Sequence, residues 1–223
     1  MKVIITGATG LVGSAVIREC IADSAITHAF VLSRKPLADD IMSHPKTSVI
    51  IHKDFSTYPP HLLERLAGCH ACIWAIGGRS TQFPDLYTYR KIQIDYTLAA
   101  ANAFARHLAP KLPNHQRFQF VFCSGKYAEW DQEKSLSFMA DTRLAKGLVE
   151  KGLCEIADEK DSHLDVWCAR PSGILPADAG FMAKLTGKLY GAIQVQDLAK
   201  ALIRIALKGG EKQIVESDEL VQS

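Results

Sequence analysis

Short apolar runs alternate with longer amphipathic segments along most of the chain. The apolar runs are rich in Val, Ile, Phe or Trp, and most lack polar alternation, so we expect strands that are covered on both faces. The predicted strands are Lys2–Thr6, His28–Ser33, Thr47–His52, Ala71–Ala75, Phe118–Ser124 and Leu164–Ala169. Helical spacing of apolar positions predicts helices at Leu11–Ala22, His61–Ala67, Leu86–Leu108, Met139–Ala157, Ala179–Lys188 and Val195–Lys208. This order predicts an α/β fold built on a doubly wound parallel sheet.

The chain has 223 residues, with no internal repeat and no linker that would divide it. We therefore expect residues 1–223 to form one domain, in which residues from about 171 to 223 are a short C-terminal part on the substrate side. Hydrophobic residues make up 48% and charged residues 22%, which excludes a disordered or low-complexity chain. No run approaches the roughly 20 apolar residues of a transmembrane helix, so no such segment is expected.

Charge and cysteine content narrow the class of protein further. The 26 basic and 24 acidic side chains leave a formal net charge of +2 without a basic cluster, so nucleic acid is not an expected partner. No secretory signal precedes the six cysteines, which predicts reduced thiols in a cytoplasmic protein. The segment Cys69–Cys72 contains metal-type ligands, but no second pair follows at zinc spacing; we expect buried thiols there and no metal.

A glycine-rich segment connects the first predicted strand to the first predicted helix. Gly7 permits a tight turn, Gly10 allows a pyrophosphate to approach the main chain, and Gly13 allows the helix to pack closely on the strand. The backbone amides of residues 9–12 (Thr9, Gly10, Leu11 and Val12) would then face the ligand at a helix N-terminus, where the dipole favours anions. Because a strand precedes this segment and a helix follows it, the pattern predicts a dinucleotide site.

The residues after the second strand indicate which dinucleotide is preferred. An acidic residue there would accept a hydrogen bond from the ribose 2′-hydroxyl of NAD(H), but the chain has Ser33 followed by Arg34 and Lys35. A guanidinium fork and an ammonium group suit a 2′-phosphate, so NADP(H) is predicted in preference to NAD(H). The alternative interpretation is a solvated basic turn.

Together these motifs resemble the short-chain dehydrogenase/reductase superfamily, in particular its atypical NAD(P)-binding branch with NmrA-like and Tat-interacting-protein-like members. The resemblance covers nearly the whole chain and implies a Rossmann fold. It implies that Asp54 and Phe55 meet the adenine and that the turn 75–78 lies against the cofactor ribose. It also implies that the turn 170–174 lies beside the nicotinamide. The cofactor-binding residues implied in these turns are Ala75, Ile76, Gly77, Pro171, Ser172 and Ile174. The segment 195–199 resembles the start of a late helix in the family.

The same resemblance implies catalytic residues, with one departure. Ser124 matches the family serine that orients the carbonyl, and Lys146 matches the lysine that holds the ribose and lowers the pKa of a catalytic tyrosine. Thr142 stands where that tyrosine is expected, and an aliphatic hydroxyl cannot act as the acid near neutral pH. Tyr127 is a candidate substitute acid, and the favoured alternative interpretation is an ordinary loop tyrosine. We interpret the Tyr87–Lys91 spacing as chance, because it lies on an earlier helix.

Two functions therefore remain open. The first is an NADPH-dependent reductase of a small carbonyl substrate, in which Ser124, Lys146 and Tyr127 are the catalytic residues. The second is a catalytically inactive NADP(H)-binding regulator or redox sensor that acts through a protein partner, which the loss of the tyrosine favours. Lys146 also has a structural interpretation, an exposed ion pair with Glu150 one helical turn away. Residues 180–185 and Tyr190 are expected to wall the substrate cleft.

Overall fold

Seven parallel strands form the central sheet in a computed structural model, which describes residues 1–180 and 191–221. These strands are β1 (Lys2–Ile5), β2 (His28–Ser33), β3 (Thr47–Ile51), β4 (Ala71–Trp74), β5 (Phe118–Cys123), β6 (Leu164–Ala169) and β9 (Ile214–Val215). Their spatial order is β3-β2-β1-β4-β5-β6-β9, and Val3 of β1 is in register with Ala29 of β2 and Ala71 of β4. The order reverses between β1 and β4, and the predicted doubly wound α/β fold is confirmed. Ligands of such sheets bind at this reversal, beyond the carboxyl ends of the strands.

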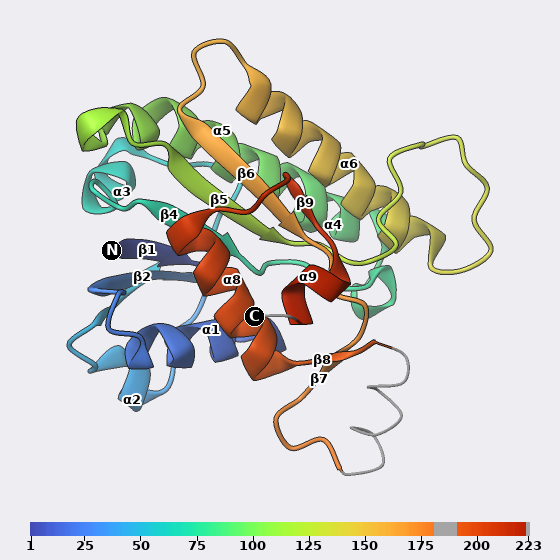
Figure 1. The fold of residues 1–223 in the computed structure, drawn as a ribbon, viewed down its shortest axis with the longest axis horizontal. Coiled ribbons are helices and arrows are strands. Elements are labelled where there is room, and N and C mark those ends of the chain that lie inside the picture. Colours follow the sequence, from blue (N-terminus) through green and yellow to red (C-terminus); the bar gives the residue numbers. More distant parts are fainter. Residues whose placement is uncertain (181–190, 222–223) are drawn as a thin grey trace.

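Helices cover both faces of the sheet (Figure 1). On one face lie α3 (Pro60–Arg65), α4 (Leu86–Arg90), α5 (Tyr96–His107) and α6 (Ala140–Asp158). On the other lie α1 (Leu11–Ala22), α2 (Asp39–Met42) and α8 (Val195–Lys208). Trp74 and Phe120 are fully buried under the first group, and Ile5 and Val31 under the second. Burial on both faces explains why the strands show little polar alternation.

The predicted strands overrun the observed ones by a single residue at four carboxyl ends. Thr6, Ala75 and Ser124 follow β1, β4 and β5, and they leave the sheet where the chain turns over its edge. The hydroxyl of Thr6 accepts a hydrogen bond from the amide of Ala75 at 3.1 Å, which links the first two of these turns. The sequence runs are therefore correct in position, and two of the extra residues, Ala75 and Ser124, line the candidate site.

The predicted long helix Leu86–Leu108 is interrupted. The π-helical segment η2 (Lys91–Asp95) separates α4 from α5. A wider turn of this kind shifts the side chains that follow it around the helix axis, and π-bulges are frequent at functional sites. Here Ile92 and Tyr96 line a cavity, and Gln93 lies under Gly77.

The C-terminal part contains elements that the sequence pattern does not predict. The strands β7 (Ile174–Leu175) and β8 (Ile193–Gln194) pair in parallel, and α9 (Ser217–Val221) follows β9. Two-residue strands are too short to show a period, so the pattern gave no signal for them. Most of the predicted helix Ala179–Lys188 lies outside the described residues, as do Tyr190 and residues 181–185. In the described part of the chain, no helix has the length and apolarity that crossing a bilayer requires.

Candidate functional site

The glycine-rich turn after β1 is held against the turn after β4. Gly7 has φ of +69°, and a Cβ atom there would lie 2.3 Å from the carbonyl oxygen of Ala75. A Cβ atom at Gly13 would lie 2.2 Å from the carbonyl oxygen of Gly7. Glycine is therefore required at both positions, at the first by conformation and close approach, and at the second because α1 packs directly on the turn.

The N-terminus of α1 presents free amide donors over this turn. Gly10 is the N-cap residue and offers no side-chain cap, while its own amide donates to the Gly7 carbonyl at 2.9 Å. The next amides, of Leu11, Val12 and Gly13, belong to the first helical turn, whose N–H groups have no acceptor within the helix. The helix dipole adds positive potential at this end, so the residues present fit the pyrophosphate of a dinucleotide.

A first cavity of about 260 Å³ opens beside the turn, over the carboxyl ends of β1, β2 and β4. Its cations are Arg34 and Lys35, which follow β2, and no carboxylate side chain of the described residues lines it. The Ser33 hydroxyl donates to the Lys35 carbonyl at 2.7 Å and fixes this tight bend. The predicted cofactor residues that line the cavity are Gly7, Thr9, Gly10, Arg34, Lys35, Phe55, Ala75, Ile76 and Gly77.

Asp54 does not line this cavity, although it was expected to meet the adenine with Phe55. Its carboxylate is exposed and accepts hydrogen bonds from the amide and hydroxyl of Ser56 at 3.0 and 2.5 Å. These bonds lower the pKa of Asp54 and close a local turn. Phe55 is 2% exposed and packs edge-on against Trp74. The aromatic residue contributes a wall of the cavity, whereas the acid supports the turn beside it.

A second cavity of about 590 Å³ continues from the first and shares Gly10, Ala75 and Gly77 with it. It lies over the carboxyl ends of β4, β5 and β6. The predicted residues that line it are Gly10, Leu11, Val12, Ala75, Gly77, Ser124, Tyr127, Lys146, Pro171, Ser172 and Ile174. The two cavities thus form one extended cleft across the reversal of strand order, as a dinucleotide and a second ligand require.

Lys146 on α6 reaches the end of β5. Its ammonium group donates to the carbonyl of Ser124 at 2.6 Å and to that of Cys123 at 3.4 Å. Burial lowers the pKa of Lys146, because desolvation disfavours the charged form. An ammonium group has three donors, so one N–H is left for a ligand in the cavity.

The structural interpretation of Lys146 does not hold. Glu150 is fully buried, so the two residues do not form an exposed pair on the surface of α6. The Glu150 carboxylate pairs instead with Arg170, at 2.9 Å from Nε and 2.5 Å from Nη2. Helical spacing alone could not reveal this, because the partner comes from the end of β6.

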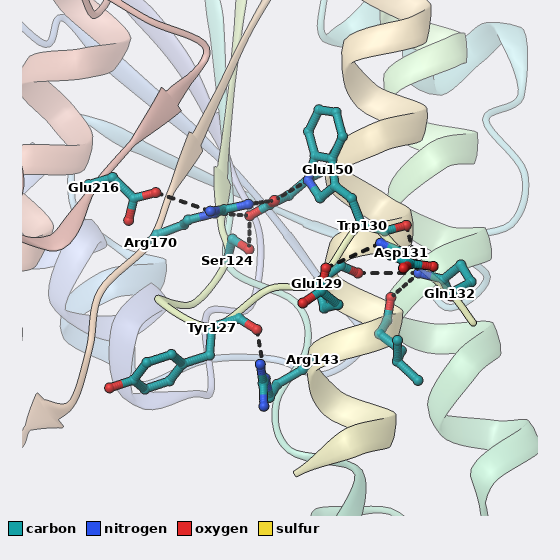
Figure 2. A network of polar contacts seen from close by, with 11 residues as sticks. Ser124, Tyr127, Glu129, Trp130, Asp131, Gln132, Arg143, Glu150, Arg170 and Glu216 are labelled. Atoms are coloured by element: carbon teal, nitrogen blue, oxygen red, sulfur yellow. Dashed lines mark hydrogen bonds and ion pairs between the residues drawn. The ribbon is translucent and has the colours of Figure 1, made fainter. Parts of the chain in front are cut away.

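The buried carboxylate also binds Ser124. Figure 2 shows Glu150 at the centre of a network that joins four segments of the chain. The Ser124 hydroxyl donates to it at 2.5 Å and the Trp130 indole at 2.7 Å, while Arg170 donates onward to Glu216 at 3.0 Å. The hydrogen of Ser124 is thus directed at Glu150 and not at the cavity, although its oxygen lines the cavity.

Thr142, at the position expected for a catalytic tyrosine, is 4% exposed. Its hydroxyl oxygen accepts from the amide of Ser80 at 2.9 Å and contacts the Ser80 hydroxyl at 3.2 Å. Thr142 therefore ties α6 to the turn η1 (Ser80–Gln82). Tyr89 of α4 is fully buried nearby, and burial raises its pKa to about 12; it does not line the cavity.

Tyr127, the candidate substitute acid, lies in the loop between β5 and α6. Its side chain is 56% exposed and lines the second cavity, and its ring is turned away from Glu150 (Figure 2). The Arg143 guanidinium carbon lies 5.8 Å from the ring centre, and its Nε donates to the Tyr127 carbonyl at 2.9 Å. By contrast, the phenol of Tyr87 is 77% exposed and lines neither cavity.

Pro171, Ser172 and Ile174 form the wall beyond β6. The Pro171 carbonyl accepts from the amide of Lys126 at 2.9 Å, and this bond joins the loops after β5 and β6. The Ser172 hydroxyl donates to the carbonyl of Gly191, at the start of the second described segment. These contacts place the predicted turn beside the cavity.

Four residues of this region have roles that were not expected from the sequence: Gln93, Trp130, Glu150 and Glu216. Gln93 is fully buried, and its Oε1 accepts from the Gly78 amide at 3.3 Å. A Cβ atom at Gly77 would lie 2.5 Å from that same oxygen. None of the four belongs to a local motif. The sequence signal that could have indicated a buried polar role is the presence of Gln93 and Glu150 at otherwise apolar helix positions.

The fold and the phosphate cradle define a dinucleotide-binding α/β protein. The family model described as NAD(P)H-binding matches residues 7–208, so the chain belongs to this family of NAD(P)H-binding proteins. Leucinostatins biosynthesis cluster protein T of Purpureocillium lilacinum is 35% identical over 129 residues, which are 56% of this chain. The match covers 42% of that protein, less than half of its length.

Solved structures show the same fold at low identity. Gre2 from Candida albicans, in complex with NADPH, has a TM-score of 0.72 and 16% identity, covering 97% of this chain and 77% of that one. The oxidoreductase ylbE from Lactococcus lactis has a TM-score of 0.68 and 15% identity, covering 100% and 95%. At this identity the similarity concerns the arrangement of strands and helices.

Proposed function

We propose that the protein is an NADPH-dependent reductase of a small carbonyl substrate. The observation that carries this proposal is that Lys146 and Tyr127 both line a cavity that continues from the phosphate cradle. NADPH would supply the hydride when bound. The chain itself would have to hold the cofactor, orient the carbonyl and deliver one proton to its oxygen.

The preference for the phosphorylated cofactor rests on the bend after β2. Arg34 and Lys35 line the first cavity, and within residues 1–180 and 191–221 no negatively charged side chain lines it with them. An adenosine ribose in this cavity would carry its 2′-phosphate towards these two cations, whereas a 2′-hydroxyl would find no carboxylate acceptor. A hydrogen bond to a charged group contributes roughly 1.5–3 kcal/mol, enough to select the cofactor.

Each catalytic side chain has a distinct role in this proposal. The free N–H of Lys146 would hold the nicotinamide ribose. Tyr127 would supply the proton. Among the described residues that line the second cavity, it is the only tyrosine. The Ser124 oxygen would accept a hydrogen bond from the alcohol product, while its own hydrogen stays on Glu150.

A catalytically inactive NADP(H)-binding regulator that acts through a protein partner is the second candidate. Two observations favour it: the Ser124 hydroxyl is engaged by Glu150, and the Thr142 hydroxyl is bound to Ser80. Such a protein would keep the cofactor cleft and lack turnover.

Calorimetric titration with NADP⁺, NADPH, NAD⁺ and NADH, followed by NADPH oxidation with a panel of aldehydes and ketones, tests both candidates. We expect binding to the phosphorylated pair, loss of that preference in Arg34→Ala, and no change in Lys53→Ala, an exposed cation outside the cavity. Tyr127→Phe should lower turnover by about 10²-fold or more, while Tyr87→Phe should not. Tight NADPH binding without turnover would favour the regulator, and no dinucleotide binding would exclude both.

A further inference from the structure

The second cavity carries a charge pattern that the cofactor does not explain. Four cationic side chains line it, Arg79, Lys126, Arg143 and Lys146, and no Asp or Glu of the described residues does. Lys146 is assigned to the ribose, and the pyrophosphate has its own amide donors on α1. The other three cations enter from the loops after β4 and β5 and from α6, the walls opposite that helix N-terminus.

These cations have no carboxylate partner within 4.0 Å in the described part of the chain. The carboxylate of Glu129 is bound to Lys134 at 2.6 Å, and this bond is the main reason that its pKa is lowered. Arg143 makes only a smaller electrostatic contribution to the same shift. Lys126 also borders a shallow depression with Glu216 and Asp218, so its charge is partly balanced there. The unbalanced positive potential is therefore centred on Arg79 and Arg143.

Arg143 is already oriented for a ligand. Its Nε donates to the Tyr127 carbonyl at 2.9 Å, and its Nη1 lies 3.4 Å from the Phe138 carbonyl. A guanidinium group has five N–H donors, so three of them remain available on a fork that these two bonds hold in place. A planar fork of this kind suits the oxygens of a carboxylate or a phosphate.

The wall around this fork is apolar and exposed. The side chain of Tyr127 is 56% exposed, that of Phe138 58% and that of Met139 36%, and all three line the cavity. Exposed aromatic and thioether side chains beside a cleft mark a surface that a ligand covers. The cavity volume of about 590 Å³ lies in the range of small-molecule sites.

We infer that the substrate carries an oxyanion, a carboxylate or a phosphate, on an apolar or aromatic body, and that Arg143 and Arg79 bind the anion. The inference rests on the proposed function, because it names the substrate class of the same site. The aromatic body would lie against Tyr127 and Phe138, and the oxyanion at the fork would place the rest of the molecule towards Ser124 and the Lys146 side of the cavity.

Binding to protein saturated with NADP⁺ tests this inference without turnover. The probes are benzoate and phenyl phosphate, with benzamide as the neutral control of similar shape. Both anions, or one of them, should bind more tightly than benzamide, with an affinity that falls as salt is added. A preference between the two anions identifies the oxyanion.

Variants localise the anion site. Arg143→Gln and Arg79→Gln should each weaken the binding of the preferred anion about tenfold, because each removes a charge-assisted contact. Arg143→Gln also removes the hydrogen bonds of Arg143 to the loop and could weaken binding by disordering that loop. Arg79→Gln leaves those bonds intact, so a loss of anion binding in this variant has no such explanation. Lys151→Gln removes an exposed charge from the same helix as Arg143, outside the cavity, and should have no effect.

The outcomes separate this inference from the proposed function. NADP⁺ affinity is measured first for each variant, and it should be unchanged. If NADP⁺ does not bind at all, the proposed function fails. If NADP⁺ binds but benzamide binds as well as the anions, if neither anion binds, or if the Arg→Gln variants lose NADP⁺ and the anion in parallel, the inference is overturned while cofactor binding stands.

Discussion

Glu150 and Arg170 meet in a two-point ion pair between α6 and the end of β6, with the carboxylate fully buried. The carboxylate also holds the hydroxyl of Ser124. Burial of an ion pair is costly, and its attraction repays that cost only when further hydrogen bonds complete the shell, as Ser124 and Trp130 do here. The pair therefore fixes the positions of two strand ends that border the candidate site.

Glu150→Ala should lower the free energy of unfolding by about 3–5 kcal/mol, since it leaves a largely buried guanidinium without its main partner. Urea denaturation monitored by circular dichroism measures this free energy. Glu155→Ala, on an exposed position of the same helix, should change it by no more than about 0.5 kcal/mol. Equal effects of the two substitutions would mean that the network contributes little.

Gly13→Ala should abolish dinucleotide binding and destabilise the fold, because the new methyl group would lie 2.2 Å from the Gly7 carbonyl oxygen. The turn after β1 would have to move away from α1, taking the free amides with it. Thermal unfolding and calorimetric titration with NADPH measure the two effects. In Gly180→Ala the new methyl group meets no heavy atom of the described residues within 4 Å, so this variant is the matched control. A Gly13→Ala variant that binds NADPH normally would contradict the assigned cradle.

The affinity for NADP⁺ should fall with rising pH before an ordinary lysine would titrate. Burial lowers the pKa of Lys146 from its usual 10.5, so its ammonium is lost at a lower pH, and with it the donor to the ribose. The dissociation constant should therefore increase as the pH rises through this lowered pKa. Titrations from about pH 7.5 to about pH 10 measure this.

Lys146→Arg is the control for that pH dependence, because a guanidinium keeps its charge throughout the range. Its NADP⁺ affinity should be lower at neutral pH, since the geometry differs, but flat with pH. If the wild-type affinity is equally flat, Lys146 does not hold the cofactor through its charge.

Thr142→Val should lower stability by about 1–2 kcal/mol, because the Ser80 amide loses its acceptor, and it should leave NADPH oxidation nearly unchanged. Thr142→Ser keeps the hydroxyl and should restore the stability. Steady-state kinetics beside denaturation curves separate the two effects. A drop in kcat that greatly exceeds the drop in stability would place Thr142 in the proton path and displace Tyr127.

The sheet and the phosphate cradle were predictable because their signals are local. A buried strand is a continuous apolar run, and Gly7, Gly10 and Gly13 stand at fixed offsets from its end. The helix Leu11–Ala22 and the helix Val195–Lys208 were predicted with the observed bounds for the same reason. Such patterns depend only on neighbours in sequence.

The polar network could not be predicted from the same patterns. Glu150, Arg170 and Glu216 are 20 and 46 residues apart, and only the packing of α6 and β9 beside β6 brings them together. The role of Asp54 also depends on its side-chain rotamer, which turns its carboxylate towards Ser56. A motif places a residue near a cleft, but competing hydrogen bonds decide where its polar atoms point.

The late strand β9 has a consequence for the open side of the sheet. It has two residues. The carbonyl of Val215 accepts a hydrogen bond from the amide of Arg170 at 2.9 Å, and the carbonyl of Gln213, just before the strand, accepts one from the amide of Cys168 at 2.7 Å. Without it, the apolar strand β6 would present unpaired amides at the margin of the sheet, a template for pairing with another chain. The edge of the sheet thus ends in a strand of only two residues, which offers a short template, and Glu216, directly after it, is held by its ion pair with Arg170.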